Sequence, residues 1–265
     1  MTRHVFSYII FLSLICFNSK PNTVTAFVTP CHVSKNSPQR SMTTTTTTAA
    51  AAAQKTMTED ELIGIAKEYV FNTSPDQLSP DFVFRGPVIG PFNKADFVKT
   101  FKSMAASDKK GMNDAFPDLQ GNVFGFSVDP VEPNRVWYFV RPRGTFTGPF
   151  DHPTVGRIEP TNAKYIAPPE ARSVMIDPET GLIIYASVGY ITDRFTGDTT
   201  KGKGAVFGLY QVMGQELDDV PGSWKMTLLQ KLSSILPESL GIPKSYSKKE
   251  ELPAWWKDER MGAEK

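Results

Sequence analysis

The strongest constraint on this chain is where its acidic residues begin. The sequence has 265 residues and 28 of them are Asp or Glu, yet the first of these is Glu59. The segment before Glu59 is rich in Ser, Thr and Ala, and it includes an unbroken run of Thr and then Ala at 43–53. Such composition is typical of targeting and low-complexity segments, which do not form a packed core. We therefore expect the folded part of the chain to begin near residue 58.

The charge of the folded part differs from that of the whole chain. The full sequence has 29 basic residues. A mature chain that lacks the five basic residues before Glu59 carries 24 basic and 28 acidic residues, a net charge of −4. The five are Arg3, Lys20, Lys35, Arg40 and Lys55. A mildly acidic chain without a clustered basic run lacks the charge pattern that binds phosphate backbones, so we expect no nucleic-acid partner.

Cysteine and histidine follow the same division. Both cysteines, Cys16 and Cys31, precede Glu59, and so do His4 and His32. A mature chain that starts near Lys55 keeps His152 as its one histidine. Disulfides, a cysteine nucleophile and a Cys- or multi-His zinc site are then excluded, and we expect no metal. Any chemistry must come from Asp, Glu, Tyr, Arg, Lys or backbone amides.

The N-terminal segment reads as two consecutive targeting signals. Residues 5–17 are apolar and too few to span a bilayer, which is typical of a signal-peptide core. The run Ala26-Phe27-Val28-Thr29-Pro30 then opens a Ser- and Thr-rich segment. This resembles the bipartite presequence of algae whose plastid derives from a red alga, such as diatoms. It predicts a signal peptide at 1–26, a transit peptide and linker at 27–57, and a plastid location; the alternative is a secreted or endomembrane protein with a Thr/Ala linker.

Apolar spacing predicts several helices in the mature chain. Thr58 and Glu61 have the spacing of a capping box, and the helix that follows ends before 72–75. Asn93 is placed to cap a second helix. Further helices are expected at 207–213 and 224–236, in the C-terminal part of the chain.

Runs rich in β-branched and aromatic residues lie between these helices. We expect strands at 81–86, 121–129, 135–146, 171–176 and 182–191. Pro142 interrupts the third of these, which predicts a bulge or an edge there. The segment 177–181 ends in glycine and joins the last two strands as the clearest hairpin. Helices gathered on one side of a curved antiparallel sheet give an α+β cone.

The order of several short motifs resembles that of a known family. Residues 60–214 resemble the SnoaL-like polyketide cyclases of the nuclear-transport-factor-2-like superfamily. The motifs are Phe82-Val83-Phe84-Arg85-Gly86, Asn93-Lys94-Ala95-Asp96-Phe97, Phe116-Pro117-Asp118-Leu119, Thr145-Phe146-Thr147-Gly148-Pro149-Phe150 and the ending Phe207-Gly208-Leu209-Tyr210-Gln211-Val212-Met213-Gly214. Residues 58–214 are therefore expected to form the SnoaL-like domain, and 215–265 a C-terminal helical extension without a family counterpart.

The resemblance implies an apolar cone with a carboxylate acid/base inside, which it places at Asp193. Burial in an apolar cavity raises the pKa of a carboxylate toward the range of a working base. The alternative is that Asp193 is a solvated residue at the strand exit, paired with Arg194. No cofactor is implied.

Two strand residues are candidate oxyanion partners of Asp193. Tyr138 has a hydroxyl and Arg141 a guanidinium, and alternation puts them on opposite faces unless a bulge at Pro142 changes the register. The alternative is that one set packs under the helices while the arginines lie on the surface. Arg85, Trp137 and Tyr190 are candidate substrate-binding residues. Arg85 is expected either to border the cone mouth or to be a solvated arginine at its rim.

Three other features have simpler interpretations. Asp118 is expected to be a turn residue, and His152, in a Pro- and Gly-rich loop, is expected to be exposed. Trp255 and Trp256 lie near the C-terminus, where they are expected to dock on the domain's own surface, cap the cone, or meet a partner or membrane edge.

These observations leave three functions open. The first is a cofactor-independent cyclase, isomerase or lyase that acts on a small apolar metabolite. The second is a non-catalytic pigment- or lipid-binding or assembly protein of the plastid with the same fold. The third is an interaction module that uses the sheet face. A homodimer formed through the sheet is implied by the resemblance, and fold alone does not choose among these functions.

Overall fold

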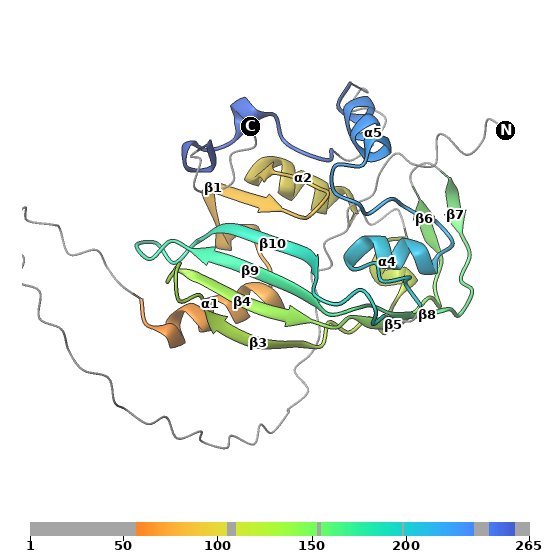
Figure 1. The fold of residues 1–265 in the computed structure, drawn as a ribbon, viewed down its shortest axis with the longest axis horizontal. Coiled ribbons are helices and arrows are strands. Elements are labelled where there is room, and N and C mark those ends of the chain that lie inside the picture. Colours follow the sequence, from red (N-terminus) through yellow and green to blue (C-terminus); the bar gives the residue numbers. More distant parts are fainter. Residues whose placement is uncertain (1–56, 105–109, 153–154, 198, 236–243, 258–265) are drawn as a thin grey trace, which may run out of the picture.

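The computed structural model describes residues 57–104, 110–152, 155–197, 199–235 and 244–257 (Figure 1). The two expected targeting segments, apart from Met57, lie outside these residues. Among the helices that the structure describes, none is long and apolar enough to cross a membrane.

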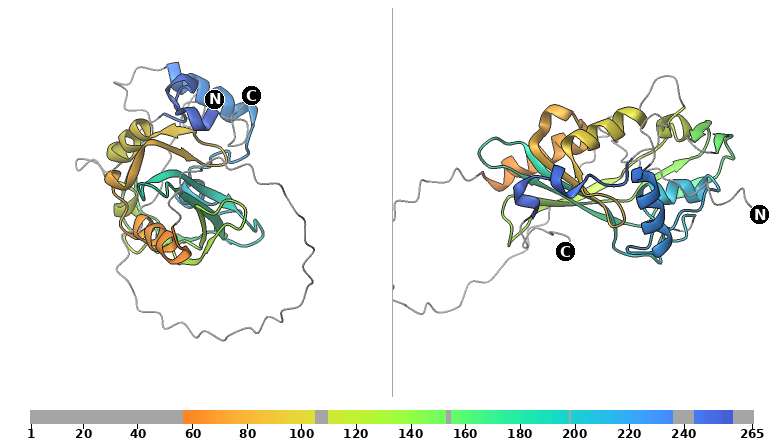
Figure 2. Two further views of the ribbon diagram at one scale, coloured as in Figure 1. Left: turned by 90° about the vertical axis from the view of Figure 1, so that its left-hand side faces the viewer. Right: turned by 90° about the horizontal axis from the view of Figure 1, so that it is seen from above.

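A curved six-stranded sheet forms the centre of the molecule (Figure 2). Its spatial order is β2-β1-β10-β9-β4-β3. Four of the five neighbouring pairs are antiparallel, whereas β1 and β10 are parallel. The strands are β1 (Leu78–Arg85), β2 (Phe92–Asn93), β3 (Val123–Val128), β4 (Arg135–Val140), β9 (Glu170–Ile176) and β10 (Ile183–Ile191).

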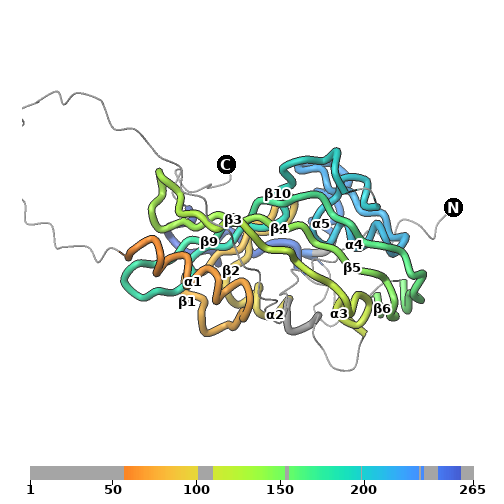
Figure 3. The backbone as a smooth tube through the Cα atoms, turned by 90° about the horizontal axis from the view of Figure 1, so that it is seen from below, coloured from red at the N-terminus to blue at the C-terminus, as the bar shows by residue number. Residues whose placement is uncertain are grey.

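Two small antiparallel ribbons extend the molecule at the end away from α1 (Figure 3). One pairs β5 (Arg143–Thr145) with β8 (Lys164–Ile166), and the other pairs β6 (Phe150–His152) with β7 (Gly156–Ile158). Pro142 separates β4 from β5, because proline lacks the N–H that would continue the ladder. The expected single strand at 135–146 with a bulge or an edge at Pro142 is therefore corrected to two strands, which belong to different sheets.

Helices α1, α2 and α5 begin where the sequence predicts, whereas α4 begins two residues earlier than expected and α3 was not expected. Thr58 caps α1 (Glu59–Phe71) in a capping box with Glu61, and the Asn93 side chain accepts from the Asp96 amide at the start of α2 (Lys94–Met104). The others are α3 (Met112–Ala115), α4 (Ala205–Val212) and α5 (Trp224–Ile235), with short 3-10 turns η2 (Pro75–Gln77), η4 (Lys249–Glu251) and η5 (Ala254–Lys257).

Alternation along the strands gives the sheet two covered faces. Phe82 and Phe84 point into the main core, where both pack edge-on or tilted against Phe97 of α2. Val83 lies between them and points to the opposite face, which we call the tail face. There residues 244–257, which we call the C-terminal segment, cover the sheet with Leu252 and Trp256. Residues of one strand thus help to build two separate apolar layers.

The expected α+β fold is confirmed, with two corrections to its details. The sheet is not wholly antiparallel, because β1 and β10 pair in parallel although a long stretch of chain separates them. Helices α1 and α2 do pack on one face, but the other face is also covered, by the C-terminal segment. Local patterns in the sequence do not predict either feature, because each depends on contacts between distant parts of the chain.

A buried ion pair joins the sheet to α4. Glu170 on β9 is 0% exposed, and its Oε2 accepts from Arg172 Nη2 at 2.9 Å. Its Oε1 accepts from the Ala205 amide, at the first residue of α4, at 2.6 Å. Burial is the largest single effect on Arg172 and would lower its pKa, but the charge and hydrogen bond of Glu170, together with Tyr138 and Tyr165, offset it and the pKa is raised. Gly204 is required beside this pair, because a Cβ there would lie 2.9 Å from Glu170 Oε1.

We predict that Glu170→Ala destabilises the protein by about 3–5 kcal/mol, because it leaves Arg172 as a buried and uncompensated charge. Urea unfolding at pH 7 measures the change. Glu170→Gln, which keeps an acceptor for the Ala205 amide, should cost less and provides a second variant if the alanine variant does not fold.

Glu159→Ala is the matched control for this prediction. Glu159 pairs with Arg157 at 2.9 Å, but its side chain is 71% exposed. An exposed pair contributes about 0–1 kcal/mol. Equal losses of stability in Glu170→Ala and Glu159→Ala would contradict a special role for the buried pair.

Candidate functional site

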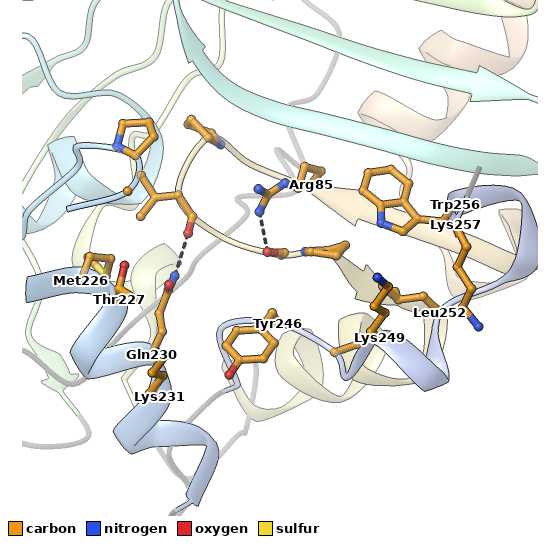
Figure 4. Close-up of a pocket in the computed structure, with 17 residues that line it drawn as sticks. Arg85, Met226, Thr227, Gln230, Lys231, Tyr246, Lys249, Leu252, Trp256 and Lys257 are labelled. Atoms are coloured by element: carbon orange, nitrogen blue, oxygen red, sulfur yellow. Dashed lines mark hydrogen bonds between the residues drawn. The ribbon is translucent and has the colours of Figure 1, made fainter. Parts of the chain in front are cut away.

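A pocket of about 590 Å³ lies on the tail face, between α5 and the C-terminal segment (Figure 4). Its floor is the loop that joins β1 to β2, one wall is α5, and the other wall is formed by η4 and η5. We call it the tail pocket. It is lined by Arg85, Pro87, Val88, Gly90, Pro91, Pro221, Gly222, Met226, Thr227, Gln230, Lys231, Tyr246, Ser247, Lys249, Leu252, Trp256 and Lys257.

Backbone and side-chain hydrogen bonds fasten the C-terminal segment to the pocket floor. The Gly90 amide donates to the Ser245 carbonyl at 2.7 Å, and the Ser247 amide donates to the Pro91 carbonyl at 2.7 Å. The Ser247 hydroxyl then donates to the buried Asp96 carboxylate of α2 at 2.6 Å. These bonds hold residues far apart in sequence in a fixed position, so the pocket is built into the fold.

The α5 wall is anchored in a similar way. Met226 and Leu229 are buried in the main core, which fixes one face of the helix. Gln230 donates from Nε2 to the Val88 carbonyl in the floor loop at 2.7 Å. Figure 4 shows Met226, Thr227, Gln230 and Lys231 on this wall, opposite Leu252 and Trp256.

The charged groups of the pocket are all basic. Arg85, Lys231, Lys249 and Lys257 contribute to the lining, which contains no Asp or Glu. Arg85 also donates through Nη1 to the Gly90 carbonyl, which holds its guanidinium beside the floor loop. Four cations without a carboxylate among the lining residues create a positive potential that favours an anionic group of a ligand.

The rest of the lining offers apolar and aromatic surface. Trp256 is 6% exposed and stacks on Tyr185, with ring centroids 5.7 Å apart and an interplanar angle of 29°. Burial raises the pKa of Tyr185 to about 12, so its hydroxyl stays protonated at neutral pH. Leu252 and Met226 add aliphatic surface on the two walls. The pocket thus combines a cationic component with a mainly apolar body.

Among the sequence-predicted residues, Arg85 is the one that lines the tail pocket. Trp137 lies on β4, and its indole donates to Asp129 Oδ2 at 2.7 Å. This hydrogen bond is the main reason that the pKa of Asp129 is lowered. Tyr190 lies on β10, opposite Ala171 of β9, and is 38% exposed. The three predicted substrate-binding residues therefore come from different parts of the sheet.

The structure does not bring the two predicted oxyanion partners together. Tyr138 is buried in the main core and stacks on Phe126, with ring centroids 5.3 Å apart. Arg141 is exposed just after β4, where its guanidinium lies 5.6 Å from the ring centroid of Phe124. The alternation of β4 separates them, as the sequence pattern indicates.

Asp193 lies in the turn that follows β10. Its Oδ1 accepts from the Phe195 amide at 3.0 Å, which is a local turn bond. Arg194 pairs with Asp219 at 3.1 Å, so the alternative in which Asp193 and Arg194 pair is not what the structure shows. A catalytic role for Asp193 stays a prediction.

Sequence reasoning missed most of the tail pocket because its walls come from residues beyond 220. Those residues carry no family resemblance. Two signals were nevertheless present: the pair Trp255 and Trp256, which was expected to dock on the domain, and the cluster of lysines at 248–249. Docking of Trp256 against Val83, Met175 and Tyr185 is confirmed.

Comparisons with known proteins give structural neighbours only. No protein-family model matches the chain, and no curated protein is significantly similar to it. One solved structure that resembles it is a proposed SnoaL-like polyketide cyclase from Jannaschia sp. CCS1, with 12% identity and a TM-score of 0.33 over 53% of this chain and 90% of that one.

Two further neighbours come from Streptomyces species. A proposed polyketide cyclase, IdmH from Streptomyces antibioticus, has 14% identity and a TM-score of 0.35 over 59% of this chain and 95% of its own. A proposed hydroxylase, AclR from Streptomyces galilaeus, has 19% identity and a TM-score of 0.31 over 48% of this chain and 81% of its own. TM-scores below 0.5 carry no functional argument.

His152 corrects another expectation. It was expected to be exposed in a loop, but it ends β6 and is 5% exposed. Its ring packs edge-on against Phe150 and Tyr210, and its Nδ1 accepts from the Val155 amide at 3.2 Å. Burial lowers the pKa of His152 from 6.5 to about 4, so the folded protein holds it neutral. Local Pro and Gly content indicated a loop, whereas pairing with β7 buries the side chain.

We predict that stability falls as the pH drops from about 6.5 to about 4. In this window the unfolded chain binds a proton at residue 152 while the folded chain does not, so protonation favours unfolding. The loss attributable to His152 is up to about 3 kcal/mol, at about 1.4 kcal/mol per pKa unit. Urea unfolding of the wild type and of His152→Asn at several pH values measures it.

The prediction is tested by the difference between the stability profiles of the two proteins over pH, because the carboxylates are the same in both. His152→Asn should show a shallower loss between pH 6.5 and 4, whatever its stability at pH 7. Parallel profiles across that range would show that residue 152 does not contribute.

Proposed function

We propose that this protein binds an anionic, amphipathic small molecule in the tail pocket, without chemistry there. The observation that carries the proposal is a lining with four cations, no carboxylate, and apolar walls that include Trp256, Leu252 and Met226. The volume of about 590 Å³ suits a ligand of drug or lipid-chain size. A fatty acid, an acidic lipid or a carboxylated pigment has this combination of a charged end and an apolar body.

Binding is favoured over catalysis by the chemistry of the lining. The side chains that most often abstract a proton next to a carbonyl are His, Asp and Glu, and the lining contains none of these three. Its lysines and Arg85 instead supply fixed positive charge and hydrogen-bond donors. The proposed ligand differs from the expected apolar metabolite in carrying an anionic group, which the positive charges of the lining would attract.

A pair of fluorescent probes tests the charge requirement. 1-Anilinonaphthalene-8-sulfonate and N-phenyl-1-naphthylamine share their ring systems, but only the first carries a sulfonate. We predict that the sulfonate probe binds at least tenfold more tightly, and that raising the salt concentration weakens this probe alone. Fluorescence titration gives both dissociation constants. Hexadecanoate should then displace the sulfonate probe at a lower concentration than 1-hexadecanol does.

Lysine substitutions locate the bound probe. The triple variant Lys231→Gln, Lys249→Gln, Lys257→Gln should weaken sulfonate binding about tenfold and change binding of the neutral probe less than twofold. A matched triple variant removes three exposed lysines outside the pocket, Lys67→Gln, Lys164→Gln and Lys201→Gln. Equal weakening in both triple variants would attribute the effect to net charge and contradict the tail pocket as the site.

We also propose that the protein works in a plastid, on the strength of the segment around Phe27. A fluorescent protein fused behind residues 1–57 and expressed in a diatom should reach the plastid. Phe27→Ala should leave it outside the plastid, while the neighbouring Val28→Ala serves as the control. Secretion of the unmodified fusion, or its retention in endomembranes, would support the alternative location. A homodimer through the sheet also stays a prediction, and its β1, β9 and β10 part is already covered by Trp256.

A further inference from the structure

Helix α5 exposes an apolar stripe on the side opposite its buried face. Trp224 is 71% exposed, Leu228 49%, Leu232 44% and Ile235 78%. At about 100° per residue, these four side chains fall within an arc of about 80°. We call this set the α5 stripe. Large apolar side chains gathered on one exposed stripe mark an interaction surface.

The stripe is rigidly presented by the rest of the molecule. The other side of α5 is held by Met226 and Leu229 in the main core and by the bond from Gln230 to the Val88 carbonyl. Figures 1 and 2 show α5 at the periphery of the molecule, away from the six-stranded sheet. The helix therefore does not need to rotate or unfold to offer the stripe to another surface.

Basic residues flank the stripe on both sides. The same helical rotation places Lys225 just beyond Leu232 at one edge and Lys231 just before Trp224 at the other. Helix α5 contains no acidic residue. Lys231 also lines the tail pocket, so the stripe and the basic pocket are continuous. An apolar stripe with lysines at its edges and a tryptophan at one end fits the boundary between lipid headgroups and acyl chains.

A second copy of this chain is a poorer match for the same surface. Two α5 helices that pack stripe to stripe would bring lysines of both copies to the edges of one contact, with no acidic residue of α5 to neutralise them. An anionic bilayer supplies the opposite charge to both edges at once. Charge complementarity thus favours an acidic bilayer over a contact between two α5 stripes.

We propose that the α5 stripe docks this protein on the surface of a bilayer that contains acidic lipids. The helix lies in the plane of the interface, with Trp224, Leu228, Leu232 and Ile235 inserted and Lys225 and Lys231 at the headgroups. The tail pocket then opens beside the membrane, where amphipathic anions are concentrated. Only this last link rests on the proposed function, because docking itself does not require the pocket to be filled.

Binding of the full chain to vesicles tests the proposal. Vesicles of phosphatidylcholine that contain phosphatidylglycerol, whose negative surface attracts basic segments, are compared with vesicles of phosphatidylcholine alone by flotation. We expect tight binding to the acidic vesicles and at least tenfold weaker binding to the neutral ones. Trp224→Ser with Ile235→Ser should weaken the acidic binding at least tenfold. Val131→Ser with Phe195→Ser, which removes two exposed apolar side chains elsewhere, should not.

Quenching of Trp224 by brominated lipid separates α5 from the N-terminal apolar segment, which all these variants share. Wild-type fluorescence should be quenched on binding, and Trp224→Phe should bind equally while losing that quenched component. Binding without quenching of Trp224 would overturn the proposal. A dimer that dissociates in the Trp224→Ser, Ile235→Ser variant, seen by analytical ultracentrifugation with no vesicle binding, would assign the stripe to a second copy instead.

Probe binding by the tail pocket and vesicle binding through the α5 stripe are measured separately. The Trp224→Ser, Ile235→Ser variant should bind the sulfonate probe as the wild type does when no vesicles are present. Loss of vesicle binding with retained probe binding supports docking through α5. Retained vesicle binding in this variant overturns docking through α5, whatever the probe shows.

Discussion

The buried carboxylate of Glu170 is the constraint on which the C-terminal half of the molecule depends. It accepts from Arg172 on its own strand and from the first amide of α4. A charge with no exposure is tolerated only with such partners, so the position of α4 is fixed relative to β9. Everything after α4, including α5 and the tail, continues from that point. The pocket beyond α4 has anchors of its own, in Met226 and Leu229 in the main core and in the bond from Gln230 to the Val88 carbonyl.

Both faces of the sheet are covered, but by different kinds of layer. Helices α1 and α2 cover one face with a continuous apolar core, and the C-terminal segment covers part of the other with Trp256 and Leu252. The second layer is thin and includes polar groups such as Arg135, whose guanidinium lies over the rings of Trp137 and Tyr185. A partly polar layer at the edge of a fold leaves room for a pocket, whereas the main core is filled by large side chains such as Phe116, Phe146 and Tyr165.

The tail pocket and the α5 stripe give one helix two roles. One edge of α5 contributes Thr227 and Lys231 to the pocket, and the neighbouring arc presents the stripe. Lys231 belongs to both. A ligand with a charged end and an apolar body partitions into the interface between water and lipid, which is where such a helix would lie. The geometry thus links the kind of ligand to the kind of surface from which it would come.

Local signals in the sequence were enough to predict much of the fold. Thr58 with Glu61, Asn93 and the glycine-terminated turn at 177–181 act over a few residues, so their effect does not depend on the rest of the chain. Pro142 likewise breaks a strand wherever the strand lies. The site was predicted less well. Arg85 was identified, but the partners that turn it into part of a pocket come from α5 and from 245–257.

The sequence by itself determined the α+β class, the order of the longer helices and of the strands β1, β3, β4, β9 and β10, and the absence of cysteine from a mature chain that starts near Lys55. Only the tertiary structure decided the parallel pairing of β1 with β10, the burial of His152 and the meeting of α5 with the β1–β2 loop. The physical reason is the range of the interactions. Caps, turns and alternation are local, whereas a pocket and a neutral buried histidine depend on which distant segments exclude water together.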